Sequence, residues 1–153
     1  MKKWILFRLS LLICSISQRK FIDCYKVDDV LGKGAFGTVY RGRCKSTGKE
    51  VAVKVIKRAK LSANDDEAIR VENEILKDLH HPNIIEFLEF FEEPKCYCIV
   101  TELVAGGELF HRLVKKEYYS EKDARDLTKI LLGAIEYCHA KNIVHRCFVP
   151  DSI

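Results

Sequence analysis

The chain contains 153 residues, of which 48% are hydrophobic and 31% are charged, with 8 glycines and 3 prolines. This composition excludes collagen-like and disordered chains and predicts a domain with a packed core. The formal net charge is +4, but the first twenty residues carry five basic side chains and no acidic one, which leaves 21 basic and 22 acidic residues for the rest. The body of the chain is therefore nearly neutral, and its charge gives no support to a nucleic-acid partner.

The seven cysteines are scattered through strand-like and helix-like segments and are odd in number. This pattern is not that of a disulfide scaffold, and without two matched C-x-x-C pairs it favours no metal site. Cys96 and Cys98 lie two residues apart in an expected strand, so their side chains should share one face. We interpret the cysteines as apolar thiols and predict no metal ligands.

Residues 1–24 are expected to form a leader before the folded domain. Two lysines followed by an apolar run over residues 4–16 are typical of a signal peptide, and residues 1–17 would then send the chain into the secretory route. This run of 13 residues would extend only about 20 Å as a helix, too short for a membrane span of about 30 Å. The alternative is a disordered or weakly helical extension on a cytoplasmic protein, or sequence from an incorrectly placed start.

From Tyr25 onward, alternating apolar residues predict β-strands, and two longer amphipathic segments predict helices. The first helix should carry an apolar stripe formed by Ala68, Val71, Ile75 and Leu79. The elements together predict an α+β fold, in which a five-stranded antiparallel sheet carries one helix and a second helix follows. The expected strands cover residues 25–31, 38–44, 50–56, 84–92 and 95–102, and the expected helices cover 65–79 and about 120–140. Ser120 and Asp123 form a Ser-x-x-Asp capping box at the start of the second helix.

Three glycines between the first two strands form a G-x-G-x-x-G motif at Gly32, Gly34 and Gly37. Because glycine lacks a Cβ, backbone amides at such a turn can approach phosphate groups closely. A dinucleotide-binding motif requires a helix after the glycines, whereas here a strand with β-branched residues follows Gly37. The motif is joined by Val39 and by the sequence Val-Ala-Val-Lys over residues 51–54.

This combination resembles the N-terminal lobe of the protein kinases, and the resemblance continues to the end of the chain. It implies an N-terminal lobe over residues 25–104 and the start of a C-terminal lobe over 105–153. Residues 106–114 and 118–124 are most similar to the calcium/calmodulin-dependent group of serine/threonine kinases. The implied activity is transfer of a phosphoryl group from ATP to a protein hydroxyl, with magnesium as the family's cofactor.

The resemblance also implies the roles of individual residues. Lys54 would contact the α and β phosphates, and Glu72, ten residues before Pro82, would pair with Lys54. Thr101 would lie at the back of the adenine pocket. The expected nucleotide-binding residues are Leu31, Gly32, Gly34, Gly37, Val39, Ala52, Lys54, Glu72, Thr101, Glu102 through its carbonyl, Val104 through its amide, and Glu108 near the ribose.

The resemblance breaks in the catalytic loop, where the family has His-Arg-Asp-Leu-Lys-Pro-Glu-Asn. Cys147 replaces the aspartate that accepts the substrate proton, Val149 replaces a lysine near the transferred phosphate, and Ser152 replaces a metal-binding asparagine. No catalytic set is intact in this loop, whose family positions here include His145, Arg146, Cys147, Val149 and Ser152.

The sequence ends at Ile153, before the position of the family's Asp-Phe-Gly segment with its magnesium-binding aspartate. We therefore expect weak or magnesium-independent ATP binding and no metal ligands. Three interpretations stay open: a fragment of an active kinase, a pseudokinase-type module that binds nucleotide or protein, and a non-functional fragment of a kinase gene. In each case the apolar face of the helix over 120–140 would be exposed, which favours a protein partner there.

Overall fold

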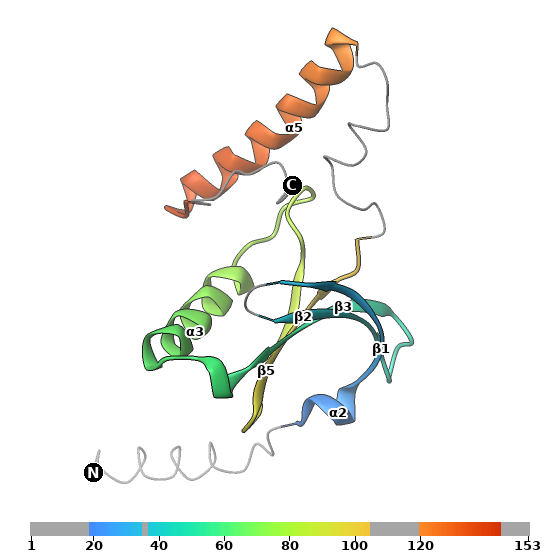
Figure 1. Cartoon of the computed structure of the whole chain (residues 1–153). Coiled ribbons are helices and arrows are strands. Elements are labelled where there is room, and N and C mark those ends of the chain that lie inside the picture. The colour runs from blue at the N-terminus through green and yellow to red at the C-terminus, as the bar shows by residue number, and fades with distance from the viewer. Residues whose placement is uncertain (1–18, 35–36, 105–119, 145–153) are drawn as a thin grey trace, which may run out of the picture.

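A computed structural model describes residues 19–34, 37–104 and 120–144 (Figure 1). Its centre is a five-stranded antiparallel sheet with the strand order β1-β2-β3-β5-β4. This sheet and its helices confirm the predicted α+β fold. The strands are β1 (Tyr25–Lys33), β2 (Thr38–Cys44), β3 (Glu50–Lys57), β4 (Phe87–Glu92) and β5 (Cys96–Glu102).

The strand ends lie within three residues of the predicted ones. The largest difference is at β4, which begins at Phe87 rather than residue 84. The amide of Ile84 donates to the carbonyl of His81 at 3.1 Å, so the chain turns there and joins the sheet only afterwards.

The side chains of β3 point alternately to the two faces of the sheet, and each face carries one hydrophobic cluster. Val51 and Val53 are 1% and 0% exposed and pack in the first cluster, whereas Ile56 is buried on the opposite face. This period of two is the pattern of a strand covered on both sides. The first cluster contains Phe21, Tyr25, Val51, Val53, Phe91, Cys98 and Val100, and the second contains Ile56, Ile69, Tyr97 and Ile99.

The four-residue helix α2 (Phe21–Cys24) lies in the range expected for the leader, and its first side chain belongs to the core. The Phe21 ring stacks on Tyr25 with 5.7 Å between centroids and meets Phe91 edge-on at 5.6 Å. Its amide donates to Oε1 of Glu93 at 2.9 Å. A helix of this length is too short to show a 3.6-residue period, so the sequence pattern could not reveal it.

Helix α3 (Ala63–Lys77) packs beside the sheet (Figure 1) and begins with a capping box, in which the Ser62 and Asp65 side chains accept each other's backbone N–H groups. Its buried side chains are Ile69 and Asn73. The predicted apolar stripe is wrong within the helix, because Val71 and Ile75 are 53% and 39% exposed, whereas its last member, Leu79, is buried beyond the end of the helix.

An ionic cluster determines which side of α3 faces the sheet. Arg70 contacts the Asp66 carboxylate at 2.9 Å on the helix and that of Glu92 at 2.8 Å on β4. The Tyr97 hydroxyl donates to Asp66 Oδ1 at 2.6 Å, and the guanidinium of Arg58 lies 4.9 Å from the centre of the Tyr97 ring. Arg58 begins the short helix η1 (Arg58–Lys60). These contacts tie the first half of α3 to β4 and β5, and residues 71 and 75 then point away from the sheet.

The same contacts shift two titrations. The hydrogen bond from Tyr97, followed by the two nearby guanidinium groups, lowers the pKa of Asp66 below its usual value. Burial and the hydrogen bond to Asp66 raise the pKa of Tyr97 to about 12. Tyr97 is thus a neutral donor and Asp66 a charged acceptor across the neutral pH range.

Helix α5 (Glu121–Ala140) has the capping box that the sequence predicts, between Ser120 and Asp123. None of its side chains is buried, and Ile130 and Leu132 are 47% and 59% exposed. Its contact with the loop after α3 runs through Tyr137, whose hydroxyl accepts the amide of His80 at 2.9 Å. Within residues 19–34, 37–104 and 120–144, no helix combines the length and the apolar character needed to cross a membrane.

Candidate functional site

The strand register places four of the predicted nucleotide-binding residues on one face of the sheet. Val39 lies opposite Lys54 in the β2–β3 pair, and Ala52 lies opposite Thr101 in the β3–β5 pair. Directly opposed residues of antiparallel strands share a face, and so do residues two apart on one strand. Val39, Ala52, Lys54 and Thr101 therefore share the face that carries Ile56 and Ile99.

The glycine turn lies at the end of β1 and β2 nearest Val39. Gly32 pairs with Val39, and the amide of Gly34 donates to the carbonyl of Gly37 at 2.8 Å, which closes the turn. A Cβ at Gly37 would lie 2.4 Å from the carbonyl oxygen of Val55, so this position accepts only glycine without movement of the backbone. Leu31, just before the motif, is 45% exposed. The turn's tip, residues 35 and 36, lies outside the described residues.

Lys54 and Glu72 do not meet. Among the described residues, neither side chain forms an ion pair within 4.0 Å or a hydrogen bond. Glu72 is exposed, and the next residue, Asn73, is the one that α3 turns inward, with 1% of its surface exposed. The Asn73 side-chain amide donates to the carbonyl of Ile69 at 2.6 Å, while its Oδ1 accepts no hydrogen bond from any described group.

The backbone at the end of β5 carries the two groups predicted to bind adenine. The Thr101 hydroxyl donates to the carbonyl of Glu102 at 3.2 Å, which leaves this oxygen capacity for one further donor. The Glu102 side chain is occupied elsewhere, because its Oε1 accepts the amide of Glu86 at 2.9 Å. Val104, which follows, is 62% exposed. The side chain of Glu102 thus holds the chain at Glu86, and its main-chain carbonyl keeps one lone pair for a further donor.

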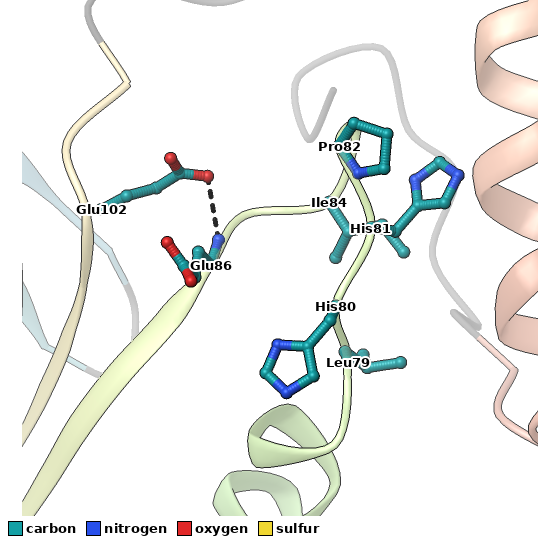
Figure 2. A pocket seen from close by; sticks show the side chains of 7 residues that line it. All are labelled: Leu79, His80, His81, Pro82, Ile84, Glu86 and Glu102. Atoms are coloured by element: carbon teal, nitrogen blue, oxygen red, sulfur yellow. Dashed lines mark hydrogen bonds between the residues drawn. The ribbon is translucent and has the colours of Figure 1, made fainter.

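A cavity of about 260 Å³ lies between the loop after α3 and the end of β5 (Figure 2). Figure 2 shows the adjacent imidazole rings of His80 and His81 pointing in different directions, as expected for consecutive residues. The His81 ring lies 5.1 Å from that of Tyr137. Among the described residues, no group of three or more His, Cys, Asp or Glu side chains is arranged to hold a metal ion. Of the predicted nucleotide-binding residues that the structure describes, only Glu102 lines this cavity, together with Leu79, His80, His81, Pro82, Ile84 and Glu86.

The remaining predicted residues lie outside the part of the chain that the structure describes. They comprise one residue expected near the ribose and the five positions of the catalytic loop: Glu108, His145, Arg146, Cys147, Val149 and Ser152.

Two residues that shape the sheet and its contact with α3 were not singled out in the sequence. Gly42, in the middle of β2, allows β3 and β1 to approach, because a Cβ there would lie 2.9 Å from Val53 Cγ2 and 3.0 Å from the carbonyl of Lys26. A glycine inside a strand pattern is a known signal of such an approach. The burial of Asn73 had no such signal, since an asparagine next to a glutamate on a helix is usually solvated.

An antiparallel sheet with a glycine turn at one end, a lysine on its third strand and a helix beside it defines the N-terminal lobe of a protein kinase. Residues 25–151 match the family model described as "Protein kinase domain", and the chain belongs to the protein kinase family. This confirms the resemblance inferred from the sequence motifs.

The relatives include serine/threonine kinases of the calcium/calmodulin-dependent group. The chain is 46% identical over 131 residues to the mouse protein named calcium/calmodulin-dependent protein kinase type IV, covering 86% of this chain and 27% of the relative. It is 43% identical over 129 residues to myosin light chain kinase A of Dictyostelium discoideum, covering 84% of this chain and 44% of the relative. The chain thus spans less than half the length of these relatives.

Proposed function

We propose that this chain binds ATP on the sheet face formed by Val39, Ala52, Lys54 and Thr101, beneath the glycine turn. The register that brings these four side chains to one face is the observation that carries the proposal. Adenine would pack between the apolar Val39 and Ala52 and would bond to the backbone of residues 102 and 104. The Lys54 ammonium would offset phosphate charge, and Gly37 would let the turn approach the phosphates.

We expect this binding to be weak. Lys54 has no carboxylate partner among the described residues, so its flexible side chain is not oriented before ATP arrives. The donor set of the catalytic loop also fits magnesium poorly, because Ser152 offers a hydroxyl where the family offers a carboxamide. ATP binding should therefore depend little on magnesium.

The catalytic loop leads us to propose that the chain transfers little or no phosphate. A thiol with a reference pKa of about 8.5 at Cys147 is mostly protonated at neutral pH and is a poor substitute for a carboxylate. Loss of a general base typically costs a factor of about 10² to 10⁴ in rate. Val149 adds no charge beside the moving phosphoryl group, and phosphoryl transfer depends on such electrostatic stabilisation.

A second candidate is a pseudokinase-type module that acts by binding protein in the cytoplasm. The exposed apolar side chains of α5, among them Ile130 and Leu132, favour a protein partner on that helix. The third interpretation, a non-functional fragment of a kinase gene, would show neither nucleotide nor partner binding.

Isothermal titration calorimetry of the 153-residue chain with ATP tests the nucleotide site. Lys54→Ala should weaken binding severalfold, because it removes the charge that faces the phosphates. Lys57→Ala is the matched control, since Lys57 lies three residues further along β3 on the opposite face and is exposed. Equal affinity of wild type and Lys54→Ala, or tight binding that requires magnesium, would contradict the proposal.

A radiolabelled phosphate-transfer assay with a basic peptide tests the catalytic part separately. We expect no incorporation above background, and Cys147→Asp alone should not restore it because Val149 and Ser152 remain. Incorporation by the wild type that is lost in Lys54→Met would show that the altered loop still supports catalysis. ATP binding without incorporation would support both parts of the proposal.

A further inference from the structure

A second groove lies on the sheet face opposite Lys54, where helix α2 meets the turn between β4 and β5. Its volume is about 340 Å³. It shares no residue with the nucleotide site, so a ligand could occupy it whether or not the chain binds ATP. The groove is lined by Phe21, Ile22, Glu93, Pro94, Lys95, Cys96 and Cys98.

Two thiols lie side by side in this groove. The sulfur atoms of Cys96 and Cys98 are 3.9 Å apart because the residues are two apart on β5 and share a face. Both are free thiols; Cys96 is half-buried and Cys98 is 3% exposed. The pair therefore presents two sulfurs to one side of the groove, with the more accessible sulfur on Cys96.

The spacing suits a bridging atom better than a disulfide. Residues two apart on a strand have Cα atoms about 6.7 Å apart, close to the upper limit of about 6.8 Å for a disulfide. Two sulfurs bound to one atom through bonds of about 2.3 Å, as for zinc and thiolate, lie roughly 3.3 to 3.8 Å apart for square to tetrahedral angles. The observed 3.9 Å is close to this range without movement of the strand.

The surroundings limit which atom could bridge the two sulfurs. A tetrahedral ion such as zinc needs two more ligands, and the described residues form no group of three or more His, Cys, Asp or Glu side chains suited to a metal. The nearby carboxylate of Glu93 already accepts the amide of Phe21 at 2.9 Å. The site thus suits a thiophilic centre that takes two sulfurs from the protein and brings its own third, apolar substituent.

We propose that Cys96 and Cys98 form a bidentate binding site for monosubstituted trivalent arsenicals. Arsenic(III) that carries one organic group takes two thiolates as its remaining ligands. Thiolates are soft ligands, and soft centres such as arsenic(III) prefer them. The organic group would lie against Phe21 and Ile22, and Ile22 is 64% exposed at the mouth of the groove.

The reaction balances without an oxidant. An arsonous diol, R–As(OH)₂, forms two As–S bonds and loses two As–O bonds, and each hydroxide leaves as water with one thiol proton. Arsenic stays trivalent and the product is neutral, so the groove buries no charge. Burial, followed by the influence of Cys96, raises the pKa of Cys98 to about 12, so the buried thiol of Cys98 is protonated and neutral at neutral pH before the reaction.

Phenylarsine oxide, which hydrates to the arsonous diol, is the probe. The reduced 153-residue chain is treated with it in excess glutathione, which removes arsenic from single thiols, and is then analysed by intact mass and peptide mapping. We expect one phenylarsenic adduct on the peptide with Cys96 and Cys98, resistant to glutathione and released by 2,3-dimercaptopropanol. Cys96→Ser, at a half-buried position, should lose the resistant adduct.

Cys44→Ser is the matched control. Hydrogen bonds from Ser46 and Thr47 lower the pKa of Cys44 to about 7, which makes it a reactive thiol, yet as a single thiol it should release arsenic to glutathione. The control variant should therefore keep the resistant adduct. Absence of this adduct from the wild type, its persistence in Cys96→Ser, or its mapping to other cysteines would overturn the proposal. Cys98→Ala removes the second sulfur and should also lose the resistant adduct. If circular dichroism shows that this variant is unfolded, the result for Cys96→Ser alone decides.

Discussion

Replacing Asn73 by leucine should stabilise the protein, although it changes a buried residue of α3. Asn73 is 1% exposed and faces the sheet next to Ile69. Its Oδ1 lies away from water and accepts no hydrogen bond within the described part of the chain. Its side-chain amide donates to the carbonyl of Ile69. Because Ile69 lies in a helix, this carbonyl can also accept a main-chain N–H and does not depend on the asparagine. The asparagine therefore contributes one bond and leaves one polar atom unpaired.

The expected gain follows from four contributions. Removing an unpaired buried oxygen is worth about 1–3 kcal/mol, and burying a leucine side chain adds about 1.5–3 kcal/mol. Loss of the hydrogen bond from the Asn73 amide costs about 0.5–1.5 kcal/mol, and the larger side chain costs about 1–3 kcal/mol in local overpacking. The net is a stabilisation of about 1 kcal/mol, or about 2–4 °C in melting temperature for a chain of this size.

Urea unfolding followed by circular dichroism measures the change, with Glu67→Leu as the control. Glu67 is an exposed residue of the same helix, and its replacement should change the free energy of unfolding by less than about 0.5 kcal/mol. A loss of more than about 1 kcal/mol in Asn73→Leu with a neutral control would refute the reasoning. That result would mean that Oδ1 accepts a hydrogen bond, so that the asparagine stabilises the folded protein overall.

Two further predictions concern the glycine turn and the ionic cluster. Gly37→Ala should destabilise the protein by about 1–3 kcal/mol, because the new Cβ would lie 2.4 Å from the Val55 carbonyl oxygen. Gly32→Ala is the control and should leave stability unchanged, because no atom lies within 4 Å of its Cβ. Thermal melting compares the two variants. Tyr97→Phe should lower the urea midpoint most between about pH 5 and 9. The Asp66 contribution is lost as pH falls through its lowered pKa, and the Tyr97 contribution is lost as pH rises from 10 toward 12, so a pH-independent difference would contradict this assignment.

The sheet could be predicted from the sequence because local patterns determine it. The alternation in β3 separates Val51 and Val53 from Ala52 and Lys54, and the structure places these pairs on opposite faces. Apolar runs and turn signals predicted the five strands and their antiparallel sheet, but they did not predict the order in which β5 lies between β3 and β4.

The orientation of α3 could not be predicted in the same way. Its sequence offers apolar residues on more than one side, including Ile69 and Val71, and tertiary contacts select between them. The selecting contacts join Arg70 on the helix to Glu92 and Asp66 on the helix to Tyr97, and both partners are more than twenty residues away in sequence. A capping box at Ser62 was visible in the sequence as the same Ser-x-x-Asp signal recognised at Ser120, and it would have located the start of the helix.

The packing of Phe21 affects how this protein should be produced for experiments. An expression boundary chosen at the family match, residue 25, would remove an aromatic ring that covers Tyr25 and Phe91. It would also remove the main-chain donor to Glu93 and the carbonyl of Ile22, which accepts the Lys45 ammonium at 2.6 Å. A recombinant protein that begins at Tyr25 would thus expose an apolar aromatic surface and would be prone to aggregation. A recombinant protein that retains residues 19–24 keeps this surface buried.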